Sequence, residues 1–369
     1  MLDLYIDEKD SHLPPISENE LSDSEVLEEI KALKKKLGDR VVVLGHHYQQ
    51  DDIIQFADIK GDSLALSQKA AKLNAPYIVF CGVHFMAETA DMITDDFQQV
   101  ILPDMQAGCT MADMATREQV DKAWEHLTSI TSEKIVPITY INCSAKLKAF
   151  VGENGGSICT SSNAPKIVKW GLDQGGKLLF FPDQHLGRNT AFALGIKLEE
   201  MALYNPNYYQ GGLTDEQILN AKVILWAGFC SVHQGFNKAQ IETLKAKDPE
   251  FEVVVHPECD FETTQAADDY GSTAYIIKKV SEARPASKFA IGTEINLVNR
   301  LQQEFQDRTV ISLSPYQCLC TTMYRVRPRW LLATFRSIDE EKPINVITVD
   351  KDTTAKASMA LDRMMELSK

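Results

Sequence analysis

Short apolar runs alternate with helical patterns from residue 40 onward, and this alternation constrains the fold more than any other feature of the sequence. Most of the runs are continuously apolar, as in strands that are buried on both faces of a parallel sheet. We expect strands at residues 41–44, 77–80, 100–102, 135–141, 157–159, 177–181, 222–226, 252–256, 288–291 and 310–313. The pattern predicts an α/β fold with parallel sheets covered by helices.

The composition is that of a globular protein with an excess of negative charge. Of the 369 residues, 44% are hydrophobic and 24% are charged, which is ordinary for a folded domain. The formal net charge of −14 argues against general binding to nucleic acid or to an anionic membrane surface. No apolar run approaches the roughly 20 residues that span a bilayer, and residues 1–20 lack an apolar signal core. We therefore expect a cytoplasmic protein, whose eight cysteines are buried, catalytic or metal-bound rather than bridged.

Three segments of the chain share one order of features. Each has a polar strand end, a hydroxyl-rich helix start, a second polar strand end and then a cysteine. The segments run from His46 to Cys109, from Asn142 to Cys230 and from His256 to Cys320. The first and third are nearly equal in length, whereas the second is longer, so we expect an insertion in it at residues 195–216. Such a repeat predicts three similar small domains in a pseudo-threefold arrangement around one axis.

The repeat also predicts the domain organisation. A loose tail at residues 1–22 and an amphipathic helix at residues 24–37, closed by Gly38, come first. The expected parts are 1–38 for the tail and helix, 39–132, 133–248 and 249–335 for the three α/β domains, and 336–369 for a C-terminal segment. Ligands of open α/β units bind outside the carboxyl ends of the strands. The three units therefore predict one central active site.

The spacing of the cysteines excludes a zinc ribbon and a ferredoxin, because no C-x-x-C pair or close array is present. Cys109, Cys230 and Cys320 each close one segment, which fits three thiolates that hold a 4Fe-4S cluster and leave one iron open. Alternatively, these are small buried residues. Cys318 competes with Cys320 for the third position.

Polar residues at strand ends are candidates for acid–base chemistry. His46 and Tyr48 follow the first strand, and a histidine there either titrates near neutral pH or is satisfied by the backbone. The sequence His256-Pro257-Glu258 pairs an imidazole with a carboxylate after an apolar strand, and we expect Glu258 to exchange protons and to orient His256. Further strand-end candidates for the cavity or its rim are His84, Asp183, His185, His233, Tyr140 and Asn142, the last two flanking Ile141.

Hydroxyl residues stand at the expected helix starts. Ser63, Ser161, Ser272 and Thr273 are either plain helix N-caps or, together with the helix N-termini, a binding site for carboxylates or phosphate. An acidic protein with an anionic substrate needs local features of this kind.

Taken in order, these motifs resemble the quinolinate synthase (quinolinate synthetase A) family. The similar strings are residues 45–49 (GHHYQ), 61–63 (GDS), 107–113 (AGCTMAD), 140–142 (YIN), 159–164 (CTSSNA), 228–233 (GFCSVH), 256–259 (HPEC), 271–273 (GST) and 320–323 (CTTM). The resemblance implies three α/β domains that each give one cysteine to a 4Fe-4S cluster. It implies an enzyme of NAD biosynthesis that condenses iminosuccinate (iminoaspartate) with dihydroxyacetone phosphate to quinolinate, with loss of phosphate and water. The open iron then acts as a Lewis acid in the dehydration.

The resemblance also assigns residues. The metal ligands are Cys109, Cys230 and Cys320, and Met323 completes a C-x-x-M pattern that favours Cys320. The implied catalytic residues are Tyr48, Tyr140, His256 and Glu258. The implied substrate-binding residues are His46, Ser63, Tyr140, Ile141, Asn142, Ser161, His256, Pro257, Glu258 and Thr273. An L-aspartate oxidase is the expected source of iminosuccinate, and a homodimer is compatible with the family.

Other readings of the cysteines remain open. One is another cluster-dependent dehydratase with a different hydroxy-acid substrate. A second is a redox sensor or electron carrier in which Cys318 or Cys259 is the fourth ligand of the cluster. A third is an α/β binding protein without a metal.

Overall fold

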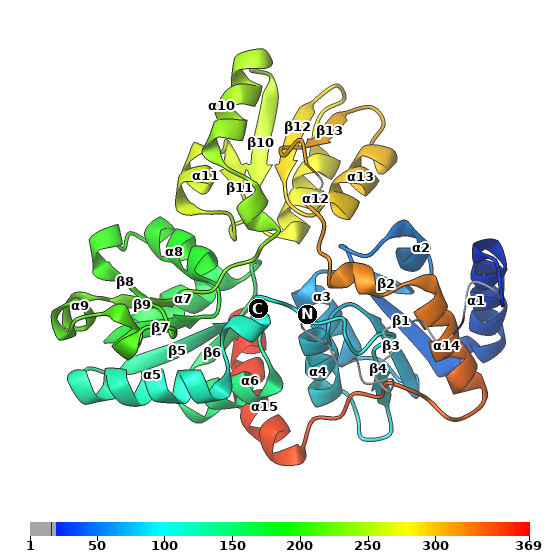
Figure 1. Ribbon diagram of the computed structural model, residues 1–369, viewed down its shortest axis with the longest axis horizontal. Coiled ribbons are helices and arrows are strands. Elements are labelled where there is room, and N and C mark those ends of the chain that lie inside the picture. Colours follow the sequence, from blue (N-terminus) through cyan, green and yellow to red (C-terminus); the bar gives the residue numbers. More distant parts are fainter. Residues whose placement is uncertain (1–15, 17–19, 317) are drawn as a thin grey trace, which may run out of the picture.

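Three separate parallel sheets form the framework of the computed structural model, which describes residue 16 and residues 20–316 and 318–369. The first sheet has the order β2-β1-β3-β4, with β1 Val41–His46, β2 Ile59–Gly61, β3 Tyr77–Cys81 and β4 Gln99–Ile101. The second has the order β6-β5-β7-β9-β8, with β5 Ile135–Tyr140, β6 Ser157–Cys159, β7 Lys177–Phe181, β8 Met201–Tyr204 and β9 Val223–Trp226. The third has the order β11-β10-β12-β13, with β10 Phe251–Val255, β11 Asp269–Tyr270, β12 Lys288–Gly292 and β13 Thr309–Ser312. Figure 1 shows the sheets, each with its helices, arranged around a common centre.

The strand order confirms the predicted α/β fold and its three similar units. In each sheet the first strand along the chain lies between the second and the third, and the third pairs with the last strand of the repeat. The second sheet has one additional edge strand, β8, which falls within the insertion expected at residues 195–216. Every strand is parallel to its neighbours, and β5, β7 and β9 are buried along their whole length. Burial on both faces explains why these runs are continuously apolar.

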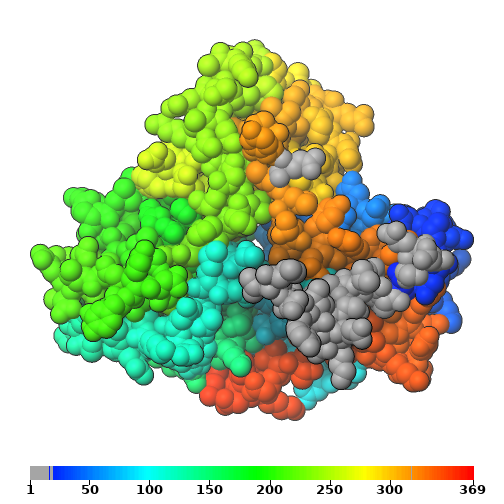
Figure 2. All heavy atoms as spheres, in the orientation of Figure 1, coloured from blue at the N-terminus to red at the C-terminus, as the bar shows by residue number. Residues whose placement is uncertain are grey.

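Helices alternate with the strands in the same order in each unit. The first unit has α1 Asp23–Leu37, α2 Asp51–Ile54, α3 Ser63–Ala70 and α4 His84–Ile93. The second has α5 Arg117–Ile130, α6 Ala145–Glu153, α7 Ala164–Asp173, α8 Gln184–Ala193 and α9 Asp215–Asn220. The third has α10 Lys238–Lys247, α11 Phe261–Ala266, α12 Thr273–Glu282 and α13 Ile295–Glu304. In each unit one helix precedes the first strand, and in Figure 2 the units form three lobes of the surface.

Short 3-10 helices complete the repeat. Those that follow the cysteines Cys109, Cys230 and Cys320 are η3 Ala112–Met114, η6 His233–Gly235 and η7 Met323–Arg325. The others are η2 Gly38–Arg40, η4 Leu198–Glu200 and η5 Tyr209–Gly212. Three longer helices, α5, α10 and α14 Pro328–Asp339, then begin the same number of residues after their cysteines. The three cysteine loops are therefore equivalent in backbone structure as well as in sequence order.

The two ends of the chain pack against the first two units. The helix α1 is capped by Ser22 and Glu25, ends at Gly38 as predicted, and packs on α14. The last helix, α15 Lys351–Leu367, packs along α6 and contacts β6. Most of the expected N-terminal tail falls on residues 1–15 and 17–19, outside the described residues. In the part of the chain that the structure describes, no helix is long and apolar enough to cross a membrane.

The apolar core is divided unequally between the units. One cluster of buried residues joins the first and second units with α14 and α15. The third unit has two clusters of its own. The first two units thus share a core, while the third unit has buried clusters of its own.

Candidate active site

A central cavity with about 670 Å³ of empty space receives residues from all three units. Its wall contains the three predicted cluster ligands, the predicted catalytic residues and most of the predicted substrate-binding residues. These are His46, Tyr48, Ser63, Cys109, Tyr140, Asn142, Ser161, Cys230, His256, Glu258, Thr273 and Cys320. Each follows the carboxyl end of a parallel strand or ends it, which is where ligands of open α/β sheets bind. Ile141 and Pro257 lie behind this wall, where they are buried and make backbone hydrogen bonds.

The three cysteines adopt one local structure. The amides of Asp113, Gln234 and Tyr324 donate to the carbonyl oxygens of Cys109, Cys230 and Cys320 at 3.1, 3.2 and 3.0 Å. In each loop the backbone amide three residues after the cysteine lowers the pKa of its thiol, and these amides belong to Ala112, His233 and Met323. Amide hydrogen bonds to sulfur stabilise the thiolate form and tune iron–sulfur clusters. The repeat therefore prepares three equivalent soft ligands.

The three thiols also interact electrostatically. Burial raises the pKa of Cys109 to about 12 and raises the pKa of Cys230 and Cys320, while the loop amides oppose the shift. Negative charge on Cys320 further raises the pKa of Cys109 and Cys230. Thiolates gathered in such a site require a compensating positive charge, which a bound metal centre supplies.

Cys318 is placed differently from these three thiols. It does not belong to the described cavity wall; it packs against the third unit's core, and its sulfur lies beside Gly235. Cys320 instead lines the cavity and accepts or donates a hydrogen bond at 3.4 Å with Thr322 Oγ1. The geometry thus favours Cys320 over Cys318 as the third cavity thiol.

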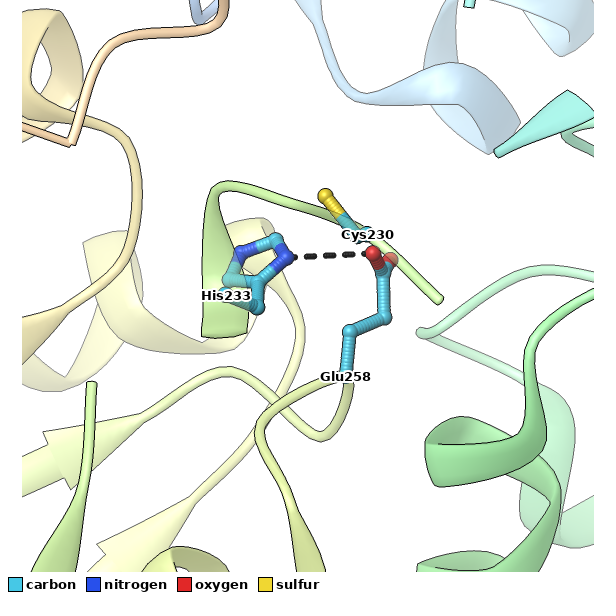
Figure 3. Close-up of side chains that lie close together, drawn as sticks. All are labelled: Cys230, His233 and Glu258. Atoms are coloured by element: carbon cyan, nitrogen blue, oxygen red, sulfur yellow. Dashed lines mark hydrogen bonds and ion pairs between the residues drawn. The ribbon is translucent and has the colours of Figure 1, made fainter. Parts of the chain in front are cut away.

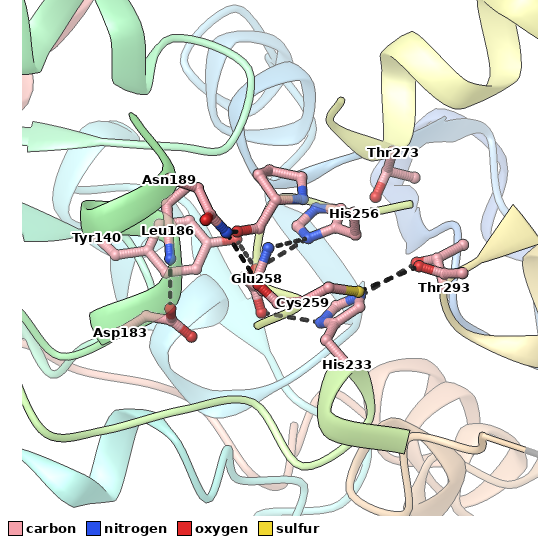
Figure 4. Close-up of polar contacts among 12 residues, drawn as sticks. Tyr140, Asp183, Leu186, Asn189, His233, His256, Glu258, Cys259, Thr273 and Thr293 are labelled. Carbon is pink, nitrogen blue, oxygen red and sulfur yellow. Dashed lines mark hydrogen bonds and ion pairs between the residues drawn. The ribbon is translucent and has the colours of Figure 1, made fainter. Parts of the chain in front are cut away.

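Glu258 is the centre of a buried hydrogen-bond network (Figure 4). Tyr140 Oη donates to Glu258 Oε1 at 2.6 Å, and His233 Nδ1 lies 3.1 Å from Glu258 Oε2. Burial opposes ionisation of Glu258, but the adjacent rings of His233 and His256 and the two hydrogen bonds keep its pKa below the ordinary value. Glu258 is 3% exposed, so these partners stabilise a buried negative charge.

From the sequence we expect Glu258 to orient His256, and in the structure the Glu258 carboxylate itself bonds to another histidine. His256 Nδ1 is 3.6 Å from Glu258 Oε1, beyond a normal hydrogen bond. The carboxylate bonds to His233, whereas His256 Nδ1 accepts from the backbone amide of Glu258 at 3.4 Å, and the His256 ring stacks on His233 with 4.4 Å between centroids. Burial lowers the pKa of His256 to about 3, so this ring is neutral at physiological pH. His233 was placed only among candidates for the cavity or its rim; its position just after Cys230 is the one sequence signal of its role.

A chain of hydroxyl groups extends from His233 to Tyr48. His233 Nε2 lies 3.2 Å from Thr293 Oγ1, which lies 2.9 Å from Tyr48 Oη. Tyr48 Oη is in turn 3.1 Å from Thr273 Oγ1. An ionised carboxylate only accepts hydrogen bonds, so His233 Nδ1 donates to Glu258; in the neutral ring, Nε2 is then the acceptor that faces Thr293. With this direction of the hydrogen bonds, Tyr48 Oη can donate to Thr293 Oγ1. Thr293 was not predicted, because its bonds join strand ends of different units.

None of the three hydroxyl residues Ser63, Ser161 and Thr273 is the N-cap of its helix. Asp62 caps α3, and Ser272 caps α12, so Ser63 and Thr273 stand at the first helical position instead. Ser161 precedes α7, whose N-cap makes no side-chain hydrogen bond. These hydroxyls face the cavity, and plain capping does not account for Ser63 or Thr273.

Asn142 supplies a further polar group. Its Oδ1 is buried and has no hydrogen-bond partner among the residues described, although the side chain lines the cavity. Buried polar atoms are normally satisfied. An unsatisfied amide in a cavity wall favours a bound ligand as the missing partner.

A second arrangement of metal-binding groups lies in the same wall. Cys230, His233 and Glu258 each offer one ligand atom, and these atoms lie within 4.8 Å of one another (Figure 3). The dashed line in Figure 3 shows that His233 and Glu258 are bonded to each other. Since both are already used in the network that leads to Tyr48, we assign them to that network rather than to a metal.

These features define the class of the protein: an α/β enzyme of three units, whose active site lies between the units and holds one cysteine from each loop. A family model described as Quinolinate synthetase A protein matches residues 28–366. The chain belongs to this family. It is 53% identical over 352 residues to a quinolinate synthase of Herpetosiphon aurantiacus, with 94% of each chain covered. It is 51% identical over 351 residues to one of Bacillus cytotoxicus, again with 94% of each chain covered. The resemblance found in the sequence is thus confirmed, and the enzyme belongs to NAD biosynthesis.

Proposed function

We propose that the enzyme condenses iminosuccinate with dihydroxyacetone phosphate, releasing phosphate and water, and forms quinolinate at a 4Fe-4S cluster. The observation that carries the proposal is the convergence of three equivalent cysteine loops on a cavity with a directed acid–base network. The family membership supports the product, and the site chemistry supports the route to it.

The residues present fit a 4Fe-4S cluster held by Cys109, Cys230 and Cys320. Three thiols whose pKa values are lowered by nearby loop amides are soft donors of the kind that bind iron–sulfur clusters. Met111, Val232 and Met323 give the same part of the cavity an apolar surface, which limits solvent access to a cluster. Among the described residues of the wall there is no fourth cysteine. When bound, such a cluster supplies an open iron that acts as a Lewis acid toward a substrate hydroxyl.

Tyr48 is proposed as the group that exchanges protons with the carbon chain of the substrate. Burial, and then the charge of Glu258, raise the pKa of Tyr48 well above its ordinary value, so the phenol is neutral and needs a relay to act as a base. As Tyr48 Oη takes a substrate proton, its own proton passes to Thr293 Oγ1, and the Thr293 proton passes to His233 Nε2. Glu258 then stabilises the His233 imidazolium, which is the role of a buried carboxylate beside a catalytic histidine.

The carboxylates of the substrate are proposed to bind to hydroxyl and amide groups of the same cavity wall. Ser63, Ser161 and Thr273 offer hydroxyls at or near helix N-termini, and Asn142 offers its amide. No Lys or Arg lies among the described residues of the wall. Binding of a dianion therefore depends on helix dipoles, hydroxyls and amides rather than on cations. His46 at the end of β1 completes this polar surface.

Substrate supply follows from the chemistry of iminosuccinate. An imine of this kind hydrolyses in water, so we propose that an L-aspartate oxidase provides it close to where it is used. A homodimer is compatible with this proposal but is not needed to complete the cavity, whose described wall comes from one chain.

The direct test is product formation by protein prepared without oxygen. Incubation with freshly generated iminosuccinate and dihydroxyacetone phosphate should yield quinolinate and one phosphate for each turnover. Cys109→Ser, Cys230→Ser and Cys320→Ser should each abolish quinolinate formation and the broad visible absorbance, whereas Cys318→Ser should retain both. Dehydration of common hydroxy acids without quinolinate formation would instead identify another cluster-dependent dehydratase. Loss of the cluster in Cys318→Ser but not in Cys320→Ser would refute the ligand assignment.

A further inference from the structure

Side-chain amides hold three consecutive carbonyl oxygens of the segment that carries Glu258. Asn189 Nδ2 lies 2.9 Å from the carbonyl oxygens of both Pro257 and Cys259. Gln234 Nε2 donates to the carbonyl oxygen of Glu258 at 3.2 Å. The peptide groups on both sides of Glu258 are thereby fixed by side chains from outside the segment.

Asn189 reaches this segment from a different unit. It belongs to α8 of the second unit, whereas the acceptors belong to the loop after β10 and to α11 of the third unit. Its third contact, 3.2 Å to Thr264 Oγ1, is also with the third unit. Asn189 is 1% exposed, and its Oδ1 has no hydrogen-bond partner among the described residues. Figure 4 shows the side chain close to Glu258, on the side away from Thr293.

A purely structural role does not explain this arrangement well. Burying an amide with an unsatisfied oxygen is unfavourable compared with an apolar side chain of similar size. The first and second units share a large apolar core, whereas the buried apolar clusters of the third unit are separate from it. The amide is thus placed where it fixes the third unit's Glu258 relative to Tyr140, which ends β5 of the second unit.

We propose that Asn189 is a positioning residue for Glu258. It sets the backbone on both sides of Glu258, so that the carboxylate lies between Tyr140 Oη at 2.6 Å and His233 Nδ1 at 3.1 Å. This inference rests on the proposed function of the network that leads from Glu258 to Tyr48. Asn189 acts through Glu258 and does not line the cavity.

The chain provides a closely matched control residue. Gln98 is buried, and its Nε2 donates to the carbonyl oxygens of Leu73 and Ala75 at 3.0 and 2.9 Å. It therefore holds two carbonyls separated by one residue, as Asn189 does. Gln98, however, precedes β4, and its acceptors precede β3, at the ends of the strands that lie away from the cavity. Gln98→Ala removes the same kind of contact without touching the site.

The first experiment compares Asn189→Ala and Gln98→Ala as cluster-loaded proteins. Hydrogen–deuterium exchange of the peptide spanning residues 255–260 should become faster in Asn189→Ala and stay unchanged in Gln98→Ala. The kcat of Asn189→Ala should fall at least about tenfold with little change in KM, since small displacements of acid–base groups cost large factors in rate. Unchanged exchange of this peptide, or a kcat equal to that of Gln98→Ala, would overturn the proposal.

A double-mutant cycle separates positioning of Glu258 from general loosening of the structure. In a Glu258→Gln background, Asn189→Ala should add little further loss of kcat, because residues that act through one group are not additive. Fully additive losses would show that Asn189 does not act through Glu258. The failure of the proposed function would look different: Glu258→Gln would turn over at the parent rate, whatever the exchange of residues 255–260.

Discussion

Burial determines which groups of the cavity carry charge at neutral pH. Burial is the main cause that lowers the pKa of His46 and His256 to about 3, so both imidazoles are neutral. Burial also keeps Tyr48 and Tyr140 protonated, because it raises their pKa values well above the ordinary value. Burial opposes ionisation of Glu258, but the nearby His233 and His256 and the hydrogen bonds from His233 and Tyr140 keep its pKa below the ordinary value. Within this network the Glu258 carboxylate thus organises the donors and acceptors, as a directed proton path requires.

Glu258→Gln tests whether this carboxylate takes part in proton exchange. The substitution keeps the size of the side chain but cannot stabilise an imidazolium by charge. We expect the variant to retain the cluster absorbance and to turn over at least about a hundredfold more slowly, within the range for acid–base groups. Quinolinate production measured under anaerobic conditions checks this. A rate near that of the parent would show that the carboxylate is structural.

Thr293 tests the path between His233 and Tyr48. Thr293→Val removes the hydroxyl that joins the two groups and keeps the shape of the side chain. We expect kcat to fall by about a hundredfold or more, whereas Thr293→Ser, which keeps a hydroxyl, should recover most of the rate. Equal rates for the Val and Ser variants would mean that protons reach Tyr48 by another path.

His47 provides a prediction for stability as a function of pH. Burial is the main cause that lowers its pKa from 6.5 to about 4 in the folded protein. Between these values the unfolded chain binds a proton that the folded chain does not. The associated stability is therefore fully present above pH 6.5 and is lost as the pH falls toward 4. In this range the parent should lose up to about 1.4 kcal/mol more per pH unit than His47→Gln. Urea unfolding at several pH values measures the difference, and parallel curves would contradict it.

At the scale of helices and strands, the sequence pattern predicted the elements with strong apolar runs. All ten expected strands are present, and their buried character explains the success. The missed strands β2, β8 and β11 are short and partly exposed, so they leave little apolar signal. The cysteines and strand-end residues of the cavity were predictable because they recur in the repeat. The hydrogen bonds of His233, Thr293 and Asn189 could not be predicted from the sequence. Each joins residues from separate segments of the chain, and the pattern does not say how these segments face one another.

The substitution Gly152→Ala tests how closely the last helix, α15, packs against α6. A Cβ atom at this position of α6 would overlap the carbonyl oxygen of Lys356 in α15. Gly152→Ala should therefore displace α15 and lower the free energy of unfolding by about 1–3 kcal/mol, as overpacking does. Thermal unfolding measures the loss, and Lys146→Ala, at an exposed position of the same helix, is the control. Identical melting temperatures for Gly152→Ala and the parent would contradict the packing.

At the scale of the whole molecule, three units place three cysteine loops around one cavity. The domain boundaries expected at residues 39, 133, 249 and 335 stay a prediction. Because α5 packs on α6 and α9, and α10 packs on β10, we propose that the first two internal boundaries lie in the cysteine loops that precede α5 and α10. Each loop would then join two units, and a cluster bound to all three thiols would tie the units together.

The central claim is that three thiolates hold a cluster whose fourth iron is open to substrate. Mössbauer spectroscopy of protein reconstituted with ⁵⁷Fe, recorded with and without a dicarboxylate substrate analogue, tests it most directly. We predict that about one quarter of the iron signal separates from the rest when the analogue is added, since one iron of four lacks a cysteine ligand. A spectrum that does not change on addition of the analogue, with all irons ligated by protein, would contradict the account and identify a redox centre.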